Sequence, residues 1–136
     1  LAKGADANAV SKDGISVLLI SLLNNYELIA IALIDSGADV NQSNIKGISP
    51  LICASHIGAF NACKSLISKG AALNHCAETK YSSLMYACEQ DHFNIVKLLV
   101  DSKININLKN SNGSTALSLC KGNSPIRSFL AEKGAH

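Results

Sequence analysis

The sequence contains no tryptophan, one methionine and two prolines, and its only arginine is Arg127. Recognition of phosphates and base edges usually depends on arginine. The formal net charge of +2 is also too small to create a strongly basic surface. No apolar run is long enough to span a bilayer, and the chain does not open with the charged and then apolar segments of a secretory signal. We therefore expect no nucleic-acid partner and no membrane insertion.

The cysteines are present in a pattern that argues against two common uses. They are five in number, and no two are spaced C-x-x-C, which disfavours a disulfide framework. Cys76 follows His75 in a short extended stretch, where adjacent side chains point to opposite faces and cannot easily share a metal. The others lie among small and apolar residues and are expected to be core hydrophobes: Cys53, Cys63, Cys88 and Cys120. We expect reduced thiols, a cytoplasmic location, no metal and no cofactor.

Apolar residues make up 48% of the chain, enough for a packed core, and they recur with a period of 33 residues. Three columns of this repeat hold the same or a similar residue in each unit, and a fourth does so in all units but one. They are Asn8, Asn41, Asn74 and Asn107; Leu18, Leu51, Leu84 and Leu117; Ser16, Ser49, Ser82 and Thr115; and Gly14, Gly47 and Gly113, with Lys80 in the remaining position. Because several independent columns agree in register, the chain is predicted to consist of stacked copies of one unit.

The structure of one unit follows from its local signals. Ser49 followed by Pro50 is a helix start, with a hydroxyl cap and a proline at the first helical position. It predicts a first helix of about nine residues, then a polar break and a second helix with apolar residues at helical spacing. Gly37 and Gly70 stand where a left-handed residue would end the second helix, and Lys46-Gly47 predicts a tight turn at a hairpin tip. Two short helices cannot bury their own apolar faces, so we expect the units to stack.

These residues resemble the ankyrin-repeat family, whose unit is also 33 residues long. Gly47 to Leu51 is similar to the family's G-x-T-P-L segment, Gly37 to Asn41 matches G-A-D-V-N, and Asn94 to Leu99 resembles the second-helix signature. The resemblance covers nearly the whole chain. It implies an all-α fold, an ankyrin-repeat solenoid of helix-turn-helix units joined by short β-hairpin-like turns. We expect one domain over residues 1–136, with the tail of a truncated repeat at 1–10, full repeats at 11–43, 44–76 and 77–109, and a shortened C-terminal repeat at 110–136.

The chain departs from the family pattern in two ways. The family's usual His after T-P-L, which bonds neighbouring units, is absent. Its position is taken by Leu19, Ile52, Met85 and Ser118. In the third full unit, Lys80 and Lys103 replace the turn glycines. Because a non-glycine residue at positive φ costs roughly 1–2 kcal/mol, this unit is expected to be strained or locally rearranged.

The two ends of the predicted array differ. Leu1 to Asn8 match only the tail of a unit, so the first full unit is expected to expose an apolar side that upstream repeats or self-association would cover. The last unit lacks two residues between its helices, and Ser124-Pro125 provides a new helix start. Its polar side chains, Lys121 and Arg127 among them, are typical of a C-terminal cap.

The resemblance implies a protein-protein interaction module that binds a partner through its hairpin tips and the exposed side of its first helices. Carried over position by position, this surface comprises Lys12, Asp13, Ile15, Leu23, Asn24, Ile45, Lys46, Ile48, His56, Ile57, Glu78, Thr79, Tyr81, Glu89, Gln90, Ser111, Asn112 and Ser114. Ile15, Ile48 and Tyr81 are spaced 33 residues apart and are expected to form one apolar row with a polar rim. The alternative is that they fold back against the helix below, which suits Tyr81 least because its hydroxyl needs water or a partner.

Two other functions stay open as alternatives. The chain is then either a structural spacer in a longer repeat array, or a substrate-recruiting fragment of a larger multidomain enzyme or effector. Catalysis by this segment itself is not expected, because no base can be placed near a cysteine, no carboxylates are paired for acid–base work, and no phosphate loop follows a strand. His92 is expected to open a second helix as a structural residue, and His56 to lie at a helix end facing solvent or a partner carboxylate.

The resemblance also implies a candidate modification. Ankyrin units in some organisms are hydroxylated at the asparagine after the A-D-V stretch, with a leucine eight residues before it. This pattern is matched by Asn41 with Leu33, Asn74 with Leu66, and Asn107 with Leu99. The simpler interpretation is that the three asparagines are turn residues that bond their own backbone.

Overall fold

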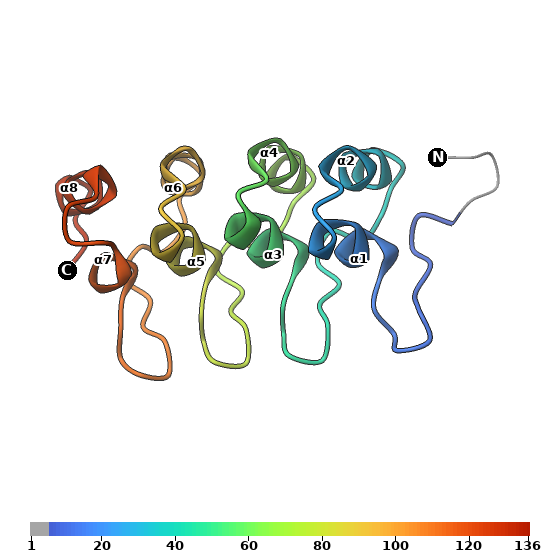
Figure 1. Cartoon of the computed structure of the whole chain (residues 1–136), viewed down its shortest axis with the longest axis horizontal. Coiled ribbons are helices and arrows are strands. Elements are labelled where there is room, and N and C mark those ends of the chain that lie inside the picture. The colour runs from blue at the N-terminus through green and yellow to red at the C-terminus, as the bar shows by residue number, and fades with distance from the viewer. Residues whose placement is uncertain (1–5) are drawn as a thin grey trace.

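The computed structural model describes residues 6–136, so the predicted tail is described only from residue 6 onward. The helices in this range are α1 (Val17–Leu23), α2 (Glu27–Asp35), α3 (Pro50–Ile57), α4 (Phe60–Ser68), α5 (Ser83–Glu89), α6 (Phe93–Asp101), α7 (Ala116–Leu119) and α8 (Pro125–Glu132). Figure 1 shows α1, α3, α5 and α7 in one row, α2, α4, α6 and α8 in a second row above it, and hairpin loops extending below the first row. The predicted all-α solenoid is confirmed.

The helices of the first row begin at the predicted hydroxyl caps. The side chains of Ser16, Ser49 and Ser82 accept hydrogen bonds of 3.1, 3.2 and 3.3 Å from the backbone N–H three residues later. The Thr115 hydroxyl oxygen likewise accepts from the N–H of Ser118, and the N–H of Thr115 donates in return to Oγ of Ser118 at 2.9 Å. The helices are shorter than the predicted nine residues, with lengths of 7, 8, 7 and 4. The last is shortest because the backbone of its C-cap, Cys120, is already extended.

The helices of the second row end at left-handed residues, as predicted. Gly37 and Gly70 have φ of +96° and +90°, and Lys103, in the equivalent position, has φ of +72°. The N–H of Gly37 and that of Ala38 bond back to carbonyls of the last turn of α2, at 3.1 and 3.0 Å. Lys80, at its hairpin tip, has φ of +62°. The third unit therefore keeps the backbone path of the others and holds two lysines in the left-handed region.

Asparagine side chains connect each unit to the next. The Oδ1 atoms of Asn8, Asn41 and Asn74 accept hydrogen bonds from backbone N–H groups 31 residues further along, at 2.6, 2.8 and 2.7 Å. Asn107 makes the corresponding bond to the N–H of His136 at 3.1 Å. The interpretation of these residues as bonding their own backbone is wrong, because their side chains reach the following repeat.

Two histidines bond to carbonyl oxygens far away in the sequence, one between units and one within a unit. Nε2 of His92, the N-cap residue of α6, lies 3.1 Å from the carbonyl oxygen of His56. Nε2 of His75 lies 2.8 Å from the carbonyl oxygen of Gly47. Because a carbonyl only accepts, each ring must carry its donated proton on Nε2. The His92 ring also fills the space at Gly58, where a Cβ would lie 2.7 Å from Cε1. The structural role predicted for His92 is confirmed.

The core lies between the two rows and between neighbouring helix pairs. Leu19, Ile52 and Met85, which take the position of the family's His, are all buried. Apolar packing therefore replaces the missing hydrogen bonds in three units. In the last unit Ser118 is exposed and closes the capping box of α7 instead.

We expect Lys80→Gly and Lys103→Gly each to raise the melting temperature, because glycine adopts positive φ without a Cβ clash. The gain in unfolding free energy should be about 0.5–1 kcal/mol, since glycine also adds freedom to the unfolded chain. Thermal and urea denaturation followed by circular dichroism measures it. Lys97→Gly, inside α6, is the matched control and should lower stability by about 1 kcal/mol. A lower melting temperature for both left-handed positions would contradict the strain assigned to them.

Candidate functional site

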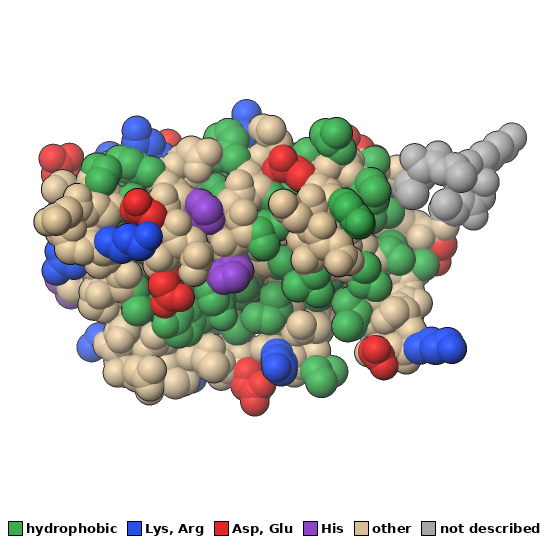
Figure 2. Space-filling view, viewed as in Figure 1, with side chains coloured by type: hydrophobic (Ala, Val, Ile, Leu, Met, Phe, Trp, Pro, Cys, Tyr) green, Lys and Arg blue, Asp and Glu red, His purple; other side chains and the backbone are tan. Residues whose placement is uncertain are grey.

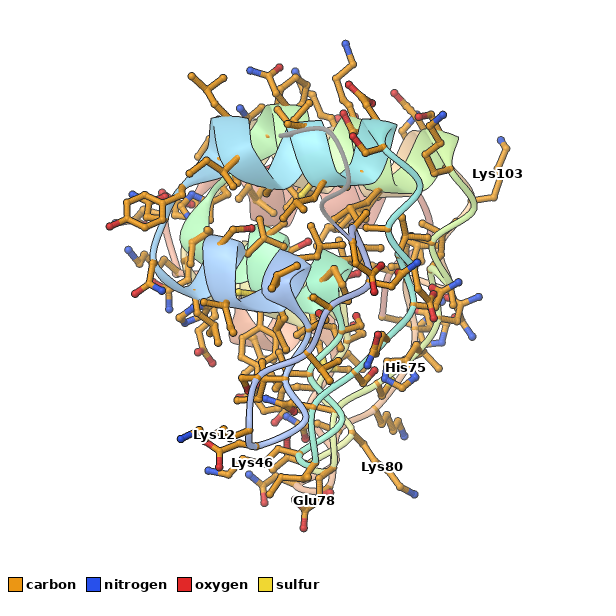
Figure 3. All side chains as sticks on the ribbon, turned by 90° about the vertical axis from the view of Figure 1, so that its right-hand side faces the viewer. Lys12, Lys46, His75, Glu78, Lys80 and Lys103 are labelled. Carbon is orange, nitrogen blue, oxygen red and sulfur yellow. The ribbon has the colours of Figure 1, made fainter. Side chains whose placement is uncertain are left out.

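Most of the predicted contact residues are exposed at the hairpin tips and along the ends of the first helices. They are Lys12, Asp13, Leu23, Asn24, Ile45, Lys46, His56, Glu78, Thr79, Gln90, Ser111 and Asn112. Figure 3 shows Lys12, Lys46 and Glu78 gathered at the hairpin tips, while Lys103 lies on a loop at the opposite side of the helices. These predicted contact positions are therefore open to solvent.

The predicted apolar row is only half-exposed. Ile15, Ile48 and Tyr81 are partly buried and packed against the core, so the alternative of folding back is confirmed for the two isoleucines. The expectation that Tyr81 is least suited to folding back is wrong. Its ring also packs against the core, and its hydroxyl donates a 3.0 Å hydrogen bond to Oε2 of Glu89 in its own repeat. Ile57 is likewise half-buried against the core. These side chains support the surface more than they project from it.

An apolar hollow of about 250 Å³ lies beside this row, and we call it the first-helix groove. Its walls come from α1, α3, α5 and the residue before the cap of α3. It is lined by Leu23, Ile48, Ile52, Cys53, His56 and Tyr86. Ile52 and Cys53 are buried and form its floor, whereas Leu23 is 53% exposed. Figure 2 shows the hydrophobic side chains of this face gathered in a band across the first-helix row, with a histidine beside it.

The C-terminal side of the groove is aromatic and then acidic. The Tyr86 ring packs edge-on against His56 at 5.3 Å between centroids and leans on the Tyr81 ring at 4.9 Å. Burial and then the nearby Glu89 carboxylate raise the pKa of Tyr86, and burial together with the bond to Glu89 raises the pKa of Tyr81. Both hydroxyls are therefore protonated at neutral pH. Tyr86 was missed in the sequence, although it lies three residues before Glu89 on one helix, the spacing of side chains that share a face.

The repeat register, the capped helix pairs and the hairpins agree with the match to known families. A family model described as ankyrin repeats (3 copies) matches residues 1–77 and 52–136, which together span the chain. The chain belongs to the ankyrin-repeat family. No curated protein matches it. Ankyrin repeats are in general protein-protein interaction modules, and the family is typically non-enzymatic.

A second hollow of this ankyrin-repeat protein, of about 500 Å³, separates the first two hairpins. It is lined by Asp13, Gly14, Ile15, Ser43, Asn44, Ile45 and Lys46, and Ile45 is 95% exposed at the tip. The second and third hairpins are in direct contact instead, because the N–H of Glu78 donates to the carbonyl of Lys46 at 2.9 Å. A Cβ at Gly47 would lie 3.2 Å from that Glu78 nitrogen, so a glycine suits this approach.

The buried thiols of the ankyrin-repeat fold are kept in their protonated form. Burial raises the pKa of the Cys53 thiol to about 11 and that of Cys63 to about 12, and it also raises the pKa of Cys88 and Cys120. Residues 6–136 contain no cluster of three or more His, Cys, Asp or Glu side chains arranged to hold a metal. None of the helices in that range is both long and apolar enough to span a bilayer.

We expect a thiol reagent at pH 8 to label Cys76 first, because it is the only one of the five cysteines that is not buried. The other four should react only when the chain unfolds. Their pKa values are raised above the usual 9.0, so the stability that their protonated forms contribute is complete below that pH. It is lost as the pH rises through the folded values of about 11 for Cys53 and about 12 for Cys63. Mass spectrometry of the labelled chain measures the order, and rapid labelling of a second cysteine in the folded protein would contradict the assignment.

Proposed function

We propose that the chain is a scaffold or adaptor module that holds a partner protein against its hairpin tips and its first-helix face. The observation that carries this proposal is the first-helix groove, an open apolar hollow with the exposed Leu23 at one edge. Exposed charges of Lys46 and Glu78 at the tips supply a polar rim. An apolar centre with a polar rim is the usual anatomy of a protein interface.

The stacked frame supports this function energetically. The groove crosses three repeats, and the bonds of Asn41 and Asn74 fix each of these repeats against the next. A surface that is already ordered loses little conformational entropy when a partner binds. The two alternatives, spacer and substrate-recruiting fragment, remain separate proposals. A spacer has no need of an open groove, whereas a recruiting fragment would use the same groove for a substrate.

The proposed location is a reducing cytoplasm. All five cysteines are free, and four are buried among apolar residues. Thiols in that state are typical of compartments that keep cysteine reduced.

We expect Leu23→Lys to abolish capture of the partner in an affinity pull-down from native lysate. Leu23 is the last residue of α1 and is half-exposed, so a lysine there is compatible with the helix C-terminus and should leave the fold intact. Substitutions of Ile15, Ile48 or Tyr81 are less suitable, because these side chains are packed against the core.

Leu28→Lys is the matched control, since Leu28 is 83% exposed on α2 and does not line the groove. A protein retained by the parent and by Leu28→Lys, but lost by Leu23→Lys, supports the proposal. Equal retention by all three chains would place the contact elsewhere, and no retention by any of them would favour the spacer.

We further propose that the N-terminal end of the array is a self-association surface. Ile29 is 53% exposed, whereas Ala62 and Ile95, its equivalents in the next two repeats, are 0% exposed beneath the preceding helix pair. A hollow of about 470 Å³ lies at the same end of the array, and its lining includes Ile20, Tyr26 and Ile29. Exposed apolar residues of this kind are usually buried against another protein surface, and we propose that a second copy of the chain provides it.

We expect the 136-residue chain to dimerise in sedimentation equilibrium, and Ile29→Lys to shift it to a monomer. A lysine at this half-exposed position adds a charge to the face, and bringing two such faces together would desolvate both charges. Leu28→Lys makes the same change at a position whose equivalents in the next two repeats are also exposed. It should leave the dimer unchanged. A parent chain that stays monomeric at high concentration would refute self-association and leave the face to an upstream repeat.

A further inference from the structure

We propose that the first-helix groove takes an extended segment of a partner protein in which an aliphatic anchor lies within a few residues of an arginine. The anchor occupies the hollow beside Leu23, and the guanidinium lies along the tyrosine rings against Glu89. This inference rests on the proposed protein-binding function and adds the chemistry of the partner to it.

The size and lining of the groove favour a single apolar side chain as its occupant. The hollow is about 250 Å³, below the roughly 300–1,000 Å³ of pockets that enclose a small molecule. Its floor is Ile52 and Cys53, and its N-terminal wall is the exposed part of Leu23. An aliphatic side chain placed here loses water-accessible area against carbon on several sides.

The acidic side of the groove lacks a cation. Glu89 is the last residue of α5, where the helix dipole disfavours a negative charge. One of its oxygens accepts the Tyr81 hydroxyl, and a carboxylate can accept several more bonds. No lysine or arginine is present among the described residues that line the groove. A basic side chain from a partner in the groove would therefore place an opposite charge beside the Glu89 carboxylate.

The aromatic wall between the hollow and Glu89 favours arginine over lysine. The rings of Tyr86 and Tyr81 lean on one another at 39° with centroids 4.9 Å apart, and they connect the groove to the carboxylate. A planar guanidinium can stack on such rings and form two parallel bonds with a carboxylate, which an ammonium cannot do.

A selection from a phage library of random linear peptides tests this inference with defined probes. The folded chain is the bait. Clones that also bind the Leu23→Lys variant are discarded, because their binding does not depend on the groove. The best peptide is then synthesised with arginine, citrulline or glutamate at the basic position, and its binding is measured by fluorescence anisotropy. Citrulline keeps the shape of arginine without its charge, so the comparison isolates the ion pair.

We expect the selected peptides to share an aliphatic residue and an arginine. Glu89→Gln should weaken binding of the arginine peptide by about three- to tenfold and reduce its dependence on salt, with little effect on the citrulline peptide. Glu132→Gln, the same change on α8 away from the groove, is the matched control and should change neither affinity.

Three results would overturn the inference. Groove-dependent peptides without a basic residue, or equal losses for arginine and citrulline with Glu89→Gln, would remove the charge assignment while leaving the groove as a protein-binding site. Failure to select any peptide that depends on Leu23 would remove the docked segment altogether. The lysate experiment with Leu23→Lys would still decide separately whether the chain binds a folded protein.

Discussion

Each helix pair of this protein buries its apolar surface against the neighbouring pair, and the rest of the structure depends on that contact. The helices are 4 to 9 residues long, too short to be stable alone in water. Burial of residues such as Ile95 is complete only because α4 lies alongside α6, whereas Ile29 at the start of the array stays half-exposed. Asn41 and Asn74 then fix the register of each contact with a hydrogen bond to the next repeat. Stability and shape therefore have the same origin.

The chemistry of the groove comes from two columns of the repeat that vary. Ile20, Cys53 and Tyr86 are equivalent residues, and the column of Leu23, His56 and Glu89 lies one helical turn further along. Across three units the two columns change from aliphatic to aromatic and acidic. Because stacking places equivalent positions side by side, the surface changes from aliphatic at the first repeat to aromatic and acidic at the third. Differences between repeats can therefore specify a partner while the shared positions maintain the frame.

Periodicity was sufficient to predict the solenoid and the caps at Ser16 and Ser49, because each depends on backbone conformation that recurs at fixed spacing. It located Lys80 and Lys103 at turn-glycine positions but left open whether they are strained in the left-handed region or the unit rearranges, and the structure shows the former. It was not sufficient for contacts between side chains of different units. The bond from Asn41 to the next repeat depends on how two units dock. Tyr81 shows the same limit within one unit, since only its rotamer decides whether the hydroxyl reaches solvent or Glu89. The sequence predicted a contact surface at the hairpin tips and helix ends, where part of the groove lies, but it did not predict the aromatic side of the groove at Tyr86.

Equilibrium unfolding in urea of Asn41→Ala, Asn74→Ala and the double variant tests most directly whether contact between repeats holds the molecule together. Asn61→Ala, exposed on α4, is the control. The account predicts that each single change lowers the unfolding free energy by about 0.5–1.5 kcal/mol, and that the whole chain still unfolds in one transition at a lower urea concentration. Unchanged midpoints, or a transition in which the remaining repeats unfold as in the parent, would contradict it.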